Sequence, residues 1–185
     1  MQSNVCKIEN GIRDLGAILK ESEKVAVYNE LNEKQTLQLR LICEEIDGML
    51  PKLIDEFEGA FWIDFQDGVC KVNVSIQFNE FTTKKKKDLL SIAKNKKNAS
   101  VTGIVAKIGA IIEEFFLEPS NVNTLCMMSD SYHWSLNQYR VEVKKEKKAE
   151  EWDELEKSVI ASIADDIIVG VKGLKADIVV VKKFA

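Results

Sequence analysis

One helical pattern constrains this chain more than any other feature of its sequence. Over residues 32–57 apolar side chains recur at steps of three and four, which places them along one side of an α-helix. Asn32 precedes the pattern and Gln35 follows three residues later, which is the spacing of a capping box. We therefore expect a long amphipathic helix on which the rest of the chain packs. Its apolar stripe consists of Leu39, Ile42, Ile46, Met49, Leu50, Leu53 and Phe57.

The opposite side of this helix is not purely polar, because Leu37, Leu41, Glu44 and Gly48 recur there at helical spacing. A solvated face rarely carries two leucines and a glycine, so we expect another element or molecule to pack or bind there. Glu44 and Glu45 have two interpretations: carboxylates that act as a base or hold a metal beside a nucleotide, or ordinary surface acids. Gly48 is expected to allow close helix packing rather than ligand contact.

Two pairs of strands are predicted, one on each side of the chain's midpoint. Residues 60–66 and 69–78 alternate apolar and polar side chains with period two, and Asp67-Gly68 between them is a strong hairpin signal. The C-terminal segment predicts two further strands around the turn 172–175. Because the run Ile178–Val181 is apolar at every position, we expect that last strand to be central or covered on both faces.

The first residues predict another amphipathic helix, over 3–19. It has two possible uses: packing within its own domain, or packing across a dimer axis to give a homodimer. Its seam repeats at alternating steps of three and four and consists of Val5, Ile8, Ile12, Leu15 and Leu19.

A lysine-rich segment precedes the next predicted helix. Residues 82–97 carry seven lysines against one aspartate, which indicates a short helix with a solvated face. The helix of residues 101–117 follows, capped around Ser100, with Lys97 just before it and Gly103 in its first turn. A helix N-terminus beside lysines can hold a phosphate, although capped helices next to lysines are also common without one.

The remaining segments complete an α+β pattern. We expect a loop over 118–133, a strand over 134–143, a helix over 150–164 and a turn at Asp165-Asp166. The sequence thus predicts a single domain over 1–185, with an N-terminal helical segment at 1–31. Its fold class would be a two-layer α/β sandwich, with helices on one face of a mixed sheet of about five strands.

Composition excludes several classes of function. The net charge of −4 argues against nucleic-acid binding, and no run is long enough for a membrane span or resembles a secretory signal, so a cytoplasmic protein is expected. Cys6, Cys43, Cys70 and Cys126 are far apart without a CxxC pair, which indicates buried, reduced thiols. With His133 as the single histidine, no metal site is expected.

The order of elements and two local matches resemble the histidine-kinase-like ATPase (Bergerat) fold, most closely the anti-sigma-factor serine kinases. In LICEEIDGML, Glu44 stands where that family has a helical glutamate, and Gly48 stands where an Asn helps bind ATP and magnesium. The segment ELEKSVIASIADDIIVGVKGLKADIVVVKKF resembles the family's closing helix, turn and two last strands. Together the matches cover about half of the chain.

The chain also departs from the family pattern. After the second strand the family has a DxGxG box that holds adenine, whereas SIQFNEF offers Asn79 without a glycine. The glycine-rich phosphate loop is missing, and KNKKNASVTG is its nearest counterpart, within an enlarged lid region over about 82–133. If ATP with magnesium is the cofactor, the resemblance implies that its contacts are Glu44, Glu45, Gly48, Asn79, Lys97, Ser100 and Gly103.

Three functions remain open from the sequence. The first is a regulatory protein with a degenerate ATPase-like domain, which acts on a protein partner such as a sigma factor. The second is an active ATP-binding protein or serine kinase, with Glu44 as base, Asn79 toward adenine and Lys97 with Gly103 toward phosphate. The third is an α+β binding domain unrelated to nucleotides, which would be favoured if the C-terminal strands did not join the 60–78 hairpin in one sheet.

Overall fold

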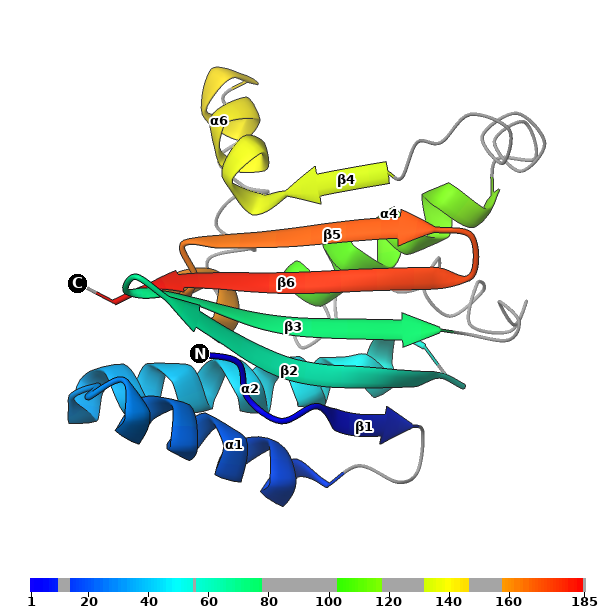
Figure 1. Ribbon diagram of the computed structural model, residues 1–185. Coiled ribbons are helices and arrows are strands. Elements are labelled where there is room, and N and C mark those ends of the chain that lie inside the picture. The colour runs from blue at the N-terminus through cyan, green and yellow to red at the C-terminus, as the bar shows by residue number, and fades with distance from the viewer. Residues whose placement is uncertain (10–13, 55, 78–102, 118–131, 147–157, 185) are drawn as a thin grey trace.

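The protein folds into one antiparallel sheet with helices packed against one of its faces (Figure 1). The architecture comes from a computed structural model, which describes residues 1–9, 14–54, 56–77, 103–117, 132–146 and 158–184. The predicted α+β sandwich is confirmed. Among the described residues the sheet has six strands rather than about five, and every pairing is antiparallel rather than mixed.

The two predicted hairpins join in the middle of this sheet. Its strand order is β1-β2-β3-β6-β5-β4. β3 pairs with β6 along its whole length, with Asn73 opposite Val179 at the centre, so both hairpins belong to one sheet. The strands are β1 Cys6–Glu9, β2 Glu58–Gln66, β3 Val69–Gln77, β4 Tyr132–Ser135, β5 Asp166–Lys172 and β6 Lys175–Lys183.

Turn chemistry and burial agree with the sequence patterns of both hairpins. Asp67 and Gly68 both have positive φ, 50° and 75°, as a tight two-residue hairpin turn requires. β6 is central, as predicted, but only one of its faces is fully buried. Ile178 is inaccessible to solvent, whereas Val179 is half-buried on the opposite face.

The predicted long helix forms as α2, Glu33–Leu53, and supplies much of the core, but it ends at Leu53, so Phe57 lies beyond it. Asn32 Oδ1 accepts a hydrogen bond from the Gln35 backbone N–H at 3.0 Å, and Gln35 Oε1 accepts one from the Asn32 N–H at 3.0 Å, which completes the capping box. All seven residues of the predicted stripe are at most 5% exposed. The other described helices are α1 Leu15–Tyr28, α4 Ile104–Leu117, α6 Leu136–Glu146 and α8 Val159–Ile163.

The helix predicted over 3–19 is wrong. Residues 6–9 form β1, and α1 begins only at Leu15, where the Asp14 side chain caps it, and continues to Tyr28. Ile8 is fully buried opposite Gly59 of β2, whereas Val5 is 61% exposed, so the supposed helical seam is not one face. Pairing with a strand fifty residues away overrides the local helical period.

The strand predicted over 134–143 is also wrong. β4 ends at Ser135, and α6 begins at Leu136. The start of α6 is capped by Asp166, whose Oδ1 accepts hydrogen bonds from Ser135 Oγ and from the Asn137 backbone N–H, both at 3.0 Å. Because this acceptor lies about thirty positions later in the chain, the residues near 136 do not themselves predict where the helix begins.

Several predictions fall wholly or partly outside the described residues. The lysine-rich helix, the cap around Ser100, nearly all of the 118–133 loop and the first part of the last helix lie there. Two described portions agree with the prediction, because α4 follows Gly103 and α8 precedes Asp165 in the link to β5. The described end of the predicted loop does not, since Tyr132 and His133 belong to β4, where they pair with β5.

Candidate functional site: the uncovered face of the sheet

The two faces of the sheet have different surroundings. Side chains such as Phe61 and Ile63 point toward the helices and are buried, with exposed fractions of 1% and 0%. Trp62 and Asp64 alternate with them and therefore point to the other face. Figure 1 shows α2 and α4 behind the sheet and α1 beside α2 below β2, and no described helix lies across the front of the sheet. The front is the uncovered face.

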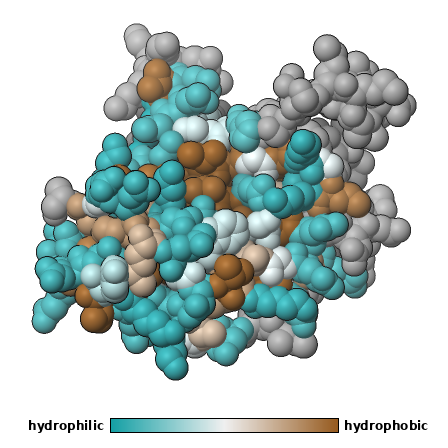
Figure 2. Space-filling model, in the orientation of Figure 1, coloured by the Kyte–Doolittle hydropathy of each residue, from teal (hydrophilic) through white to brown (hydrophobic). Residues whose placement is uncertain are grey.

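Apolar side chains form a row across this uncovered face. Strand pairing aligns Trp62, Asn73, Val179 and Ile168 on four neighbouring strands. Strands lie about 4.8 Å apart, so the row is about 15 Å wide. Val181 continues it along β6. We call Trp62, Ile168, Val179 and Val181, all of them half-buried, the sheet patch. Figure 2 shows apolar groups reaching the surface between hydrophilic ones on this side.

Hydrogen bonds fix the orientation of the tryptophan in the sheet patch. Trp62 Nε1 donates to Asp64 Oδ2 at 3.0 Å, and Asn73 Nδ2 donates to the same oxygen at 3.0 Å. Asn73, only 8% exposed, also donates to the Lys71 carbonyl oxygen. A buried amide and a carboxylate thus hold the indole in one place on an otherwise accessible surface.

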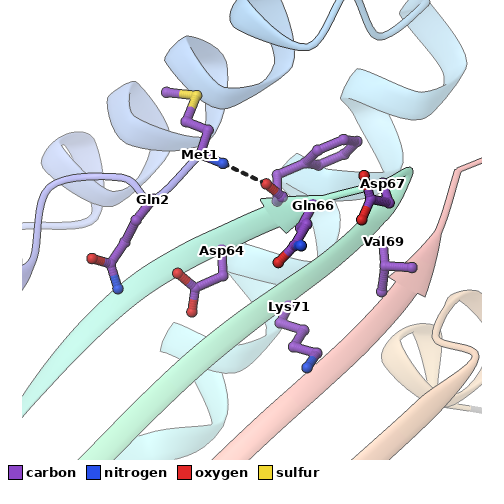
Figure 3. Close-up of a pocket in the computed structure, with 8 residues that line it drawn as sticks. Met1, Gln2, Asp64, Gln66, Asp67, Val69 and Lys71 are labelled. Carbon is purple, nitrogen blue, oxygen red and sulfur yellow. Dashed lines mark hydrogen bonds between the residues drawn. The ribbon is translucent and has the colours of Figure 1, made fainter.

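A polar hollow lies beside the sheet patch, near the β2–β3 turn (Figure 3). Its volume is about 660 Å³. Asp64 and Lys71 line its floor, and the Met1 ammonium donates to the Phe65 carbonyl oxygen at 2.6 Å. Carboxylates, amides and an ammonium side chain are mixed here, a composition suited to hydrogen bonding. The full lining is Met1, Gln2, Asp64, Phe65, Gln66, Asp67, Val69 and Lys71.

Three of the predicted nucleotide contacts, Glu44, Glu45 and Gly48, lie on α2 and not beside the sheet patch. Glu44 lies on α2 and accepts a hydrogen bond from Arg40 Nε at 3.0 Å, and Glu45 is exposed to solvent. Gly48 is exposed too, and a Cβ built on it would meet nothing within 4 Å, so the prediction that it allows close helix packing is wrong. These residues are on the outside of the helix layer, away from the sheet patch.

Of the other predicted contacts, Gly103 is described and lies at the start of α4. Gly103 directly precedes this helix with a φ of 107°, and its carbonyl oxygen accepts a hydrogen bond from the Lys107 N–H. Asn79, Lys97 and Ser100 lie outside the described residues. Across the described ranges no cluster of three or more histidine, cysteine or acidic residues could hold a metal ion.

Two of the three described thiols are buried, as predicted, and the third is half-buried. Cys43 and Cys70 are inaccessible to solvent, and Cys6 is half-buried. Burial raises the pKa of the Cys43 thiol well above its ordinary value and raises the pKa of Cys70 to about 12. Both thiols are therefore protonated near neutral pH, the state in which a thiol is a poor nucleophile.

Comparisons with family models, with curated proteins and with solved structures gave no match for this chain. No helix among the described residues has the length and apolar character needed to cross a membrane.

Sequence reasoning missed the sheet patch, although two signals for it were present. Trp62 is a large aromatic residue on the otherwise polar side of an alternating strand, and the run Ile178–Val181 is apolar on both sides of its strand. Each indicates an apolar contribution to the second face of a sheet. The pairing of β3 with β6, which brings the two signals together, is a long-range contact that a local pattern does not contain.

Proposed function

We propose that this chain is a regulatory protein that binds another protein through the sheet patch and does not itself catalyse a reaction. The observation that supports this most is Trp62, an aromatic side chain held in place by Asp64 on a face that no described element covers. Tryptophans in such surroundings are the residue type that most often dominates the binding energy of a protein interface.

The shape of the surface favours a protein over a small molecule. Small ligands bind in concave pockets that enclose most of their surface, whereas the sheet patch runs across four strands of an open sheet face. Its neighbours Asp64, Lys71 and Asp177 are polar or charged, so the apolar centre has a polar rim. An apolar centre with a polar rim is the usual composition of a protein interface.

The resemblance to anti-sigma-factor kinases makes a sigma factor, or a regulator of one, the first partner to test. In this proposal the ATPase-like features are degenerate. This is supported by Glu44, which is paired with Arg40, and by the exposed Gly48 that replaces the metal-binding Asn of the resembled family.

Site-specific photo-crosslinking in cells tests the proposal. A benzophenone amino acid replaces Val179 in the sheet patch, and the control carries it at Glu45, which is exposed on α2. We expect a discrete protein adduct at position 179 and none of the same size at position 45. With the purified partner, Trp62→Ala should weaken binding about 30-fold or more, the loss typical of a hot-spot residue.

Two results would contradict this function. One is the same set of adducts at positions 179 and 45, which would mean that the sheet patch has no specific partner. The other is calorimetric titration with ATP and magnesium that shows one-to-one binding, lost in Glu44→Ala. That result would support an active nucleotide site built around Glu44 in place of a purely protein-binding role.

A further inference from the structure

Three large apolar side chains that are strongly exposed lie near one another at the connected end of the helices α1 and α2. Val27 is 79% exposed, Tyr28 72% and Leu37 55%, although Leu39, two residues after Leu37, is fully buried. Removing such groups from water is favourable at roughly 25 cal/mol per Å² of apolar surface. This surface is separate from the sheet patch, which lies on the opposite side of the sheet from the helices.

Helix register places these side chains on one surface. α1 and α2 lie side by side, joined by a short connection (Figure 1). Arg40 of α2 forms an ion pair with Glu23 of α1 at 3.7 Å. One turn from that pair toward the connection, Val27 of α1 therefore comes beside Leu37 of α2.

A groove between the two helices adjoins these residues. It has a volume of about 360 Å³, and its apolar lining comes mainly from Leu31 and Leu37. Leu31 is half-buried and packs on the core, so the groove floor is fixed. We call Val27, Tyr28, Leu31 and Leu37 the hairpin patch. The rest of the groove lining is Ser22, Glu23, Glu33, Thr36 and Arg40.

The rim of the hairpin patch is acidic. Over residues 23–44 there are four carboxylates and three cations. Lys24 is already paired with Glu21, and Arg40 with both Glu23 and Glu44. Glu30 and Glu33 remain exposed beside the groove, with Lys34 as the nearby cation. A partner with positive charges around an apolar surface complements this rim.

We propose that the hairpin patch docks an amphipathic helix of a partner protein whose apolar face is flanked by lysine or arginine. A third helix fits the groove between two antiparallel helices, with side chains at i, i+3, i+4 and i+7 contacting Leu31, Leu37 and Val27. Its basic flanks lie against Glu30 and Glu33.

A pair of designed peptides tests this proposal on the full chain. One is a fluorescein-labelled amphipathic helix of about 18 residues with leucines at helical spacing and lysines on the other positions; its twin has glutamates in place of lysines. By fluorescence anisotropy, the lysine peptide should bind at least about tenfold more tightly than the glutamate twin. Its affinity should fall as salt concentration rises.

Matched variants locate the binding surface. Leu37→Ser, and Val27→Ser as a second variant, should each weaken the lysine peptide by about tenfold or more. Leu174→Ser removes a 46% exposed leucine from the β5–β6 turn and should leave the affinity unchanged. Glu33→Gln should weaken binding, whereas Glu142→Gln on α6 should not. Urea-unfolding midpoints within error of the parent show that each variant is folded.

Three results would overturn the proposal. Equal affinity for both peptides would show that charge plays no part in the recognition. An unchanged affinity in folded Leu37→Ser and Val27→Ser would place binding elsewhere. A peptide-free dimer in sedimentation velocity that dissociates on Leu37→Ser would assign the patch to a second copy of this chain. Trp62→Ala changes the sheet patch and leaves the hairpin patch intact, so the proposed function and this proposal are tested independently.

Discussion

At the scale of single residues, Gly59 and Gly48 differ in the space around them: there is no room for a side chain at Gly59, whereas the space at Gly48 is open. Gly59 of β2 lies between Ile8 and Ile76, and a Cβ built on it would come within 2.3 Å of the Ser75 carbonyl oxygen. Gly59→Ala must therefore push strands apart. We expect the free energy of unfolding to fall by about 1–3 kcal/mol, measured by urea denaturation at neutral pH.

The matched control for that change is Gly48→Ala, where a Cβ would meet nothing within 4 Å in the middle of α2. It should raise the free energy of unfolding by about 0.5–1 kcal/mol, because alanine loses less backbone entropy in a helix. An unchanged midpoint in Gly59→Ala would contradict the close strand approach. A loss in Gly48→Ala would show that this helix face is covered.

At the scale of elements, α6 depends on a contact distant in sequence. Asp166 accepts hydrogen bonds from Ser135 Oγ and the Asn137 N–H, and Arg140 of α6 donates to the carbonyl oxygens of Ala161 and Asp165. Asp166→Ala removes the cap and should lower the free energy of unfolding by about 1–2 kcal/mol. Amide exchange in residues 136–142 should also become faster.

The control for that prediction is Asp177→Ala on the neighbouring strand β6. Asp177 is half exposed and forms a surface ion pair with Lys175 at 3.2 Å. Its removal should change stability little, because surface ion pairs contribute little. Equal exchange rates at α6 in both variants would mean that Asp166 does not hold the helix start.

The elements that sequence reasoning predicted correctly have their causes nearby in the chain. α2 has its capping box within Asn32–Gln35, and the β2–β3 hairpin has its turn in Asp67-Gly68. β1 and α6 were mispredicted because their partners, Gly59 and Asp166, are tens of residues away. Apolar residues spaced three and four apart in a short segment do not show whether that segment will pair as a strand with a distant part of the chain.

At the scale of the whole molecule, the difference between local and long-range causes also explains why the candidate site was missed. Glu44 and Gly48 were found by local similarity, and the structure places both on the outside of a helix. Trp62 and Val179 belong to different hairpins and share a surface only because β3 pairs with β6. A site made by sheet assembly is therefore less visible in sequence than one carried by a single motif.

Attachment of the N-terminal residues to the rest of the molecule should depend on pH through one carboxylate. Glu21 of α1 is 8% exposed and accepts hydrogen bonds from the Asn4 backbone N–H and side chain at 3.1 and 3.2 Å. The Ser3 N–H in turn donates to the Ile63 carbonyl oxygen of β2. The hydrogen bond from Lys24, followed by those from Asn4, lowers the pKa of Glu21 below its ordinary 4.5, although burial opposes the shift.

Because this pKa is lower in the folded than in the unfolded chain, the charged carboxylate stabilises the fold above about pH 4.5, and that contribution is lost as the pH falls through the lowered pKa. The urea midpoint of the parent should therefore fall more between pH 6 and pH 3 than that of Glu21→Gln. Glu23→Gln, at an exposed carboxylate two residues later on α1, should follow the parent. If Glu21→Gln and the parent lose stability equally, Glu21 does not link α1 to the N-terminal residues at neutral pH.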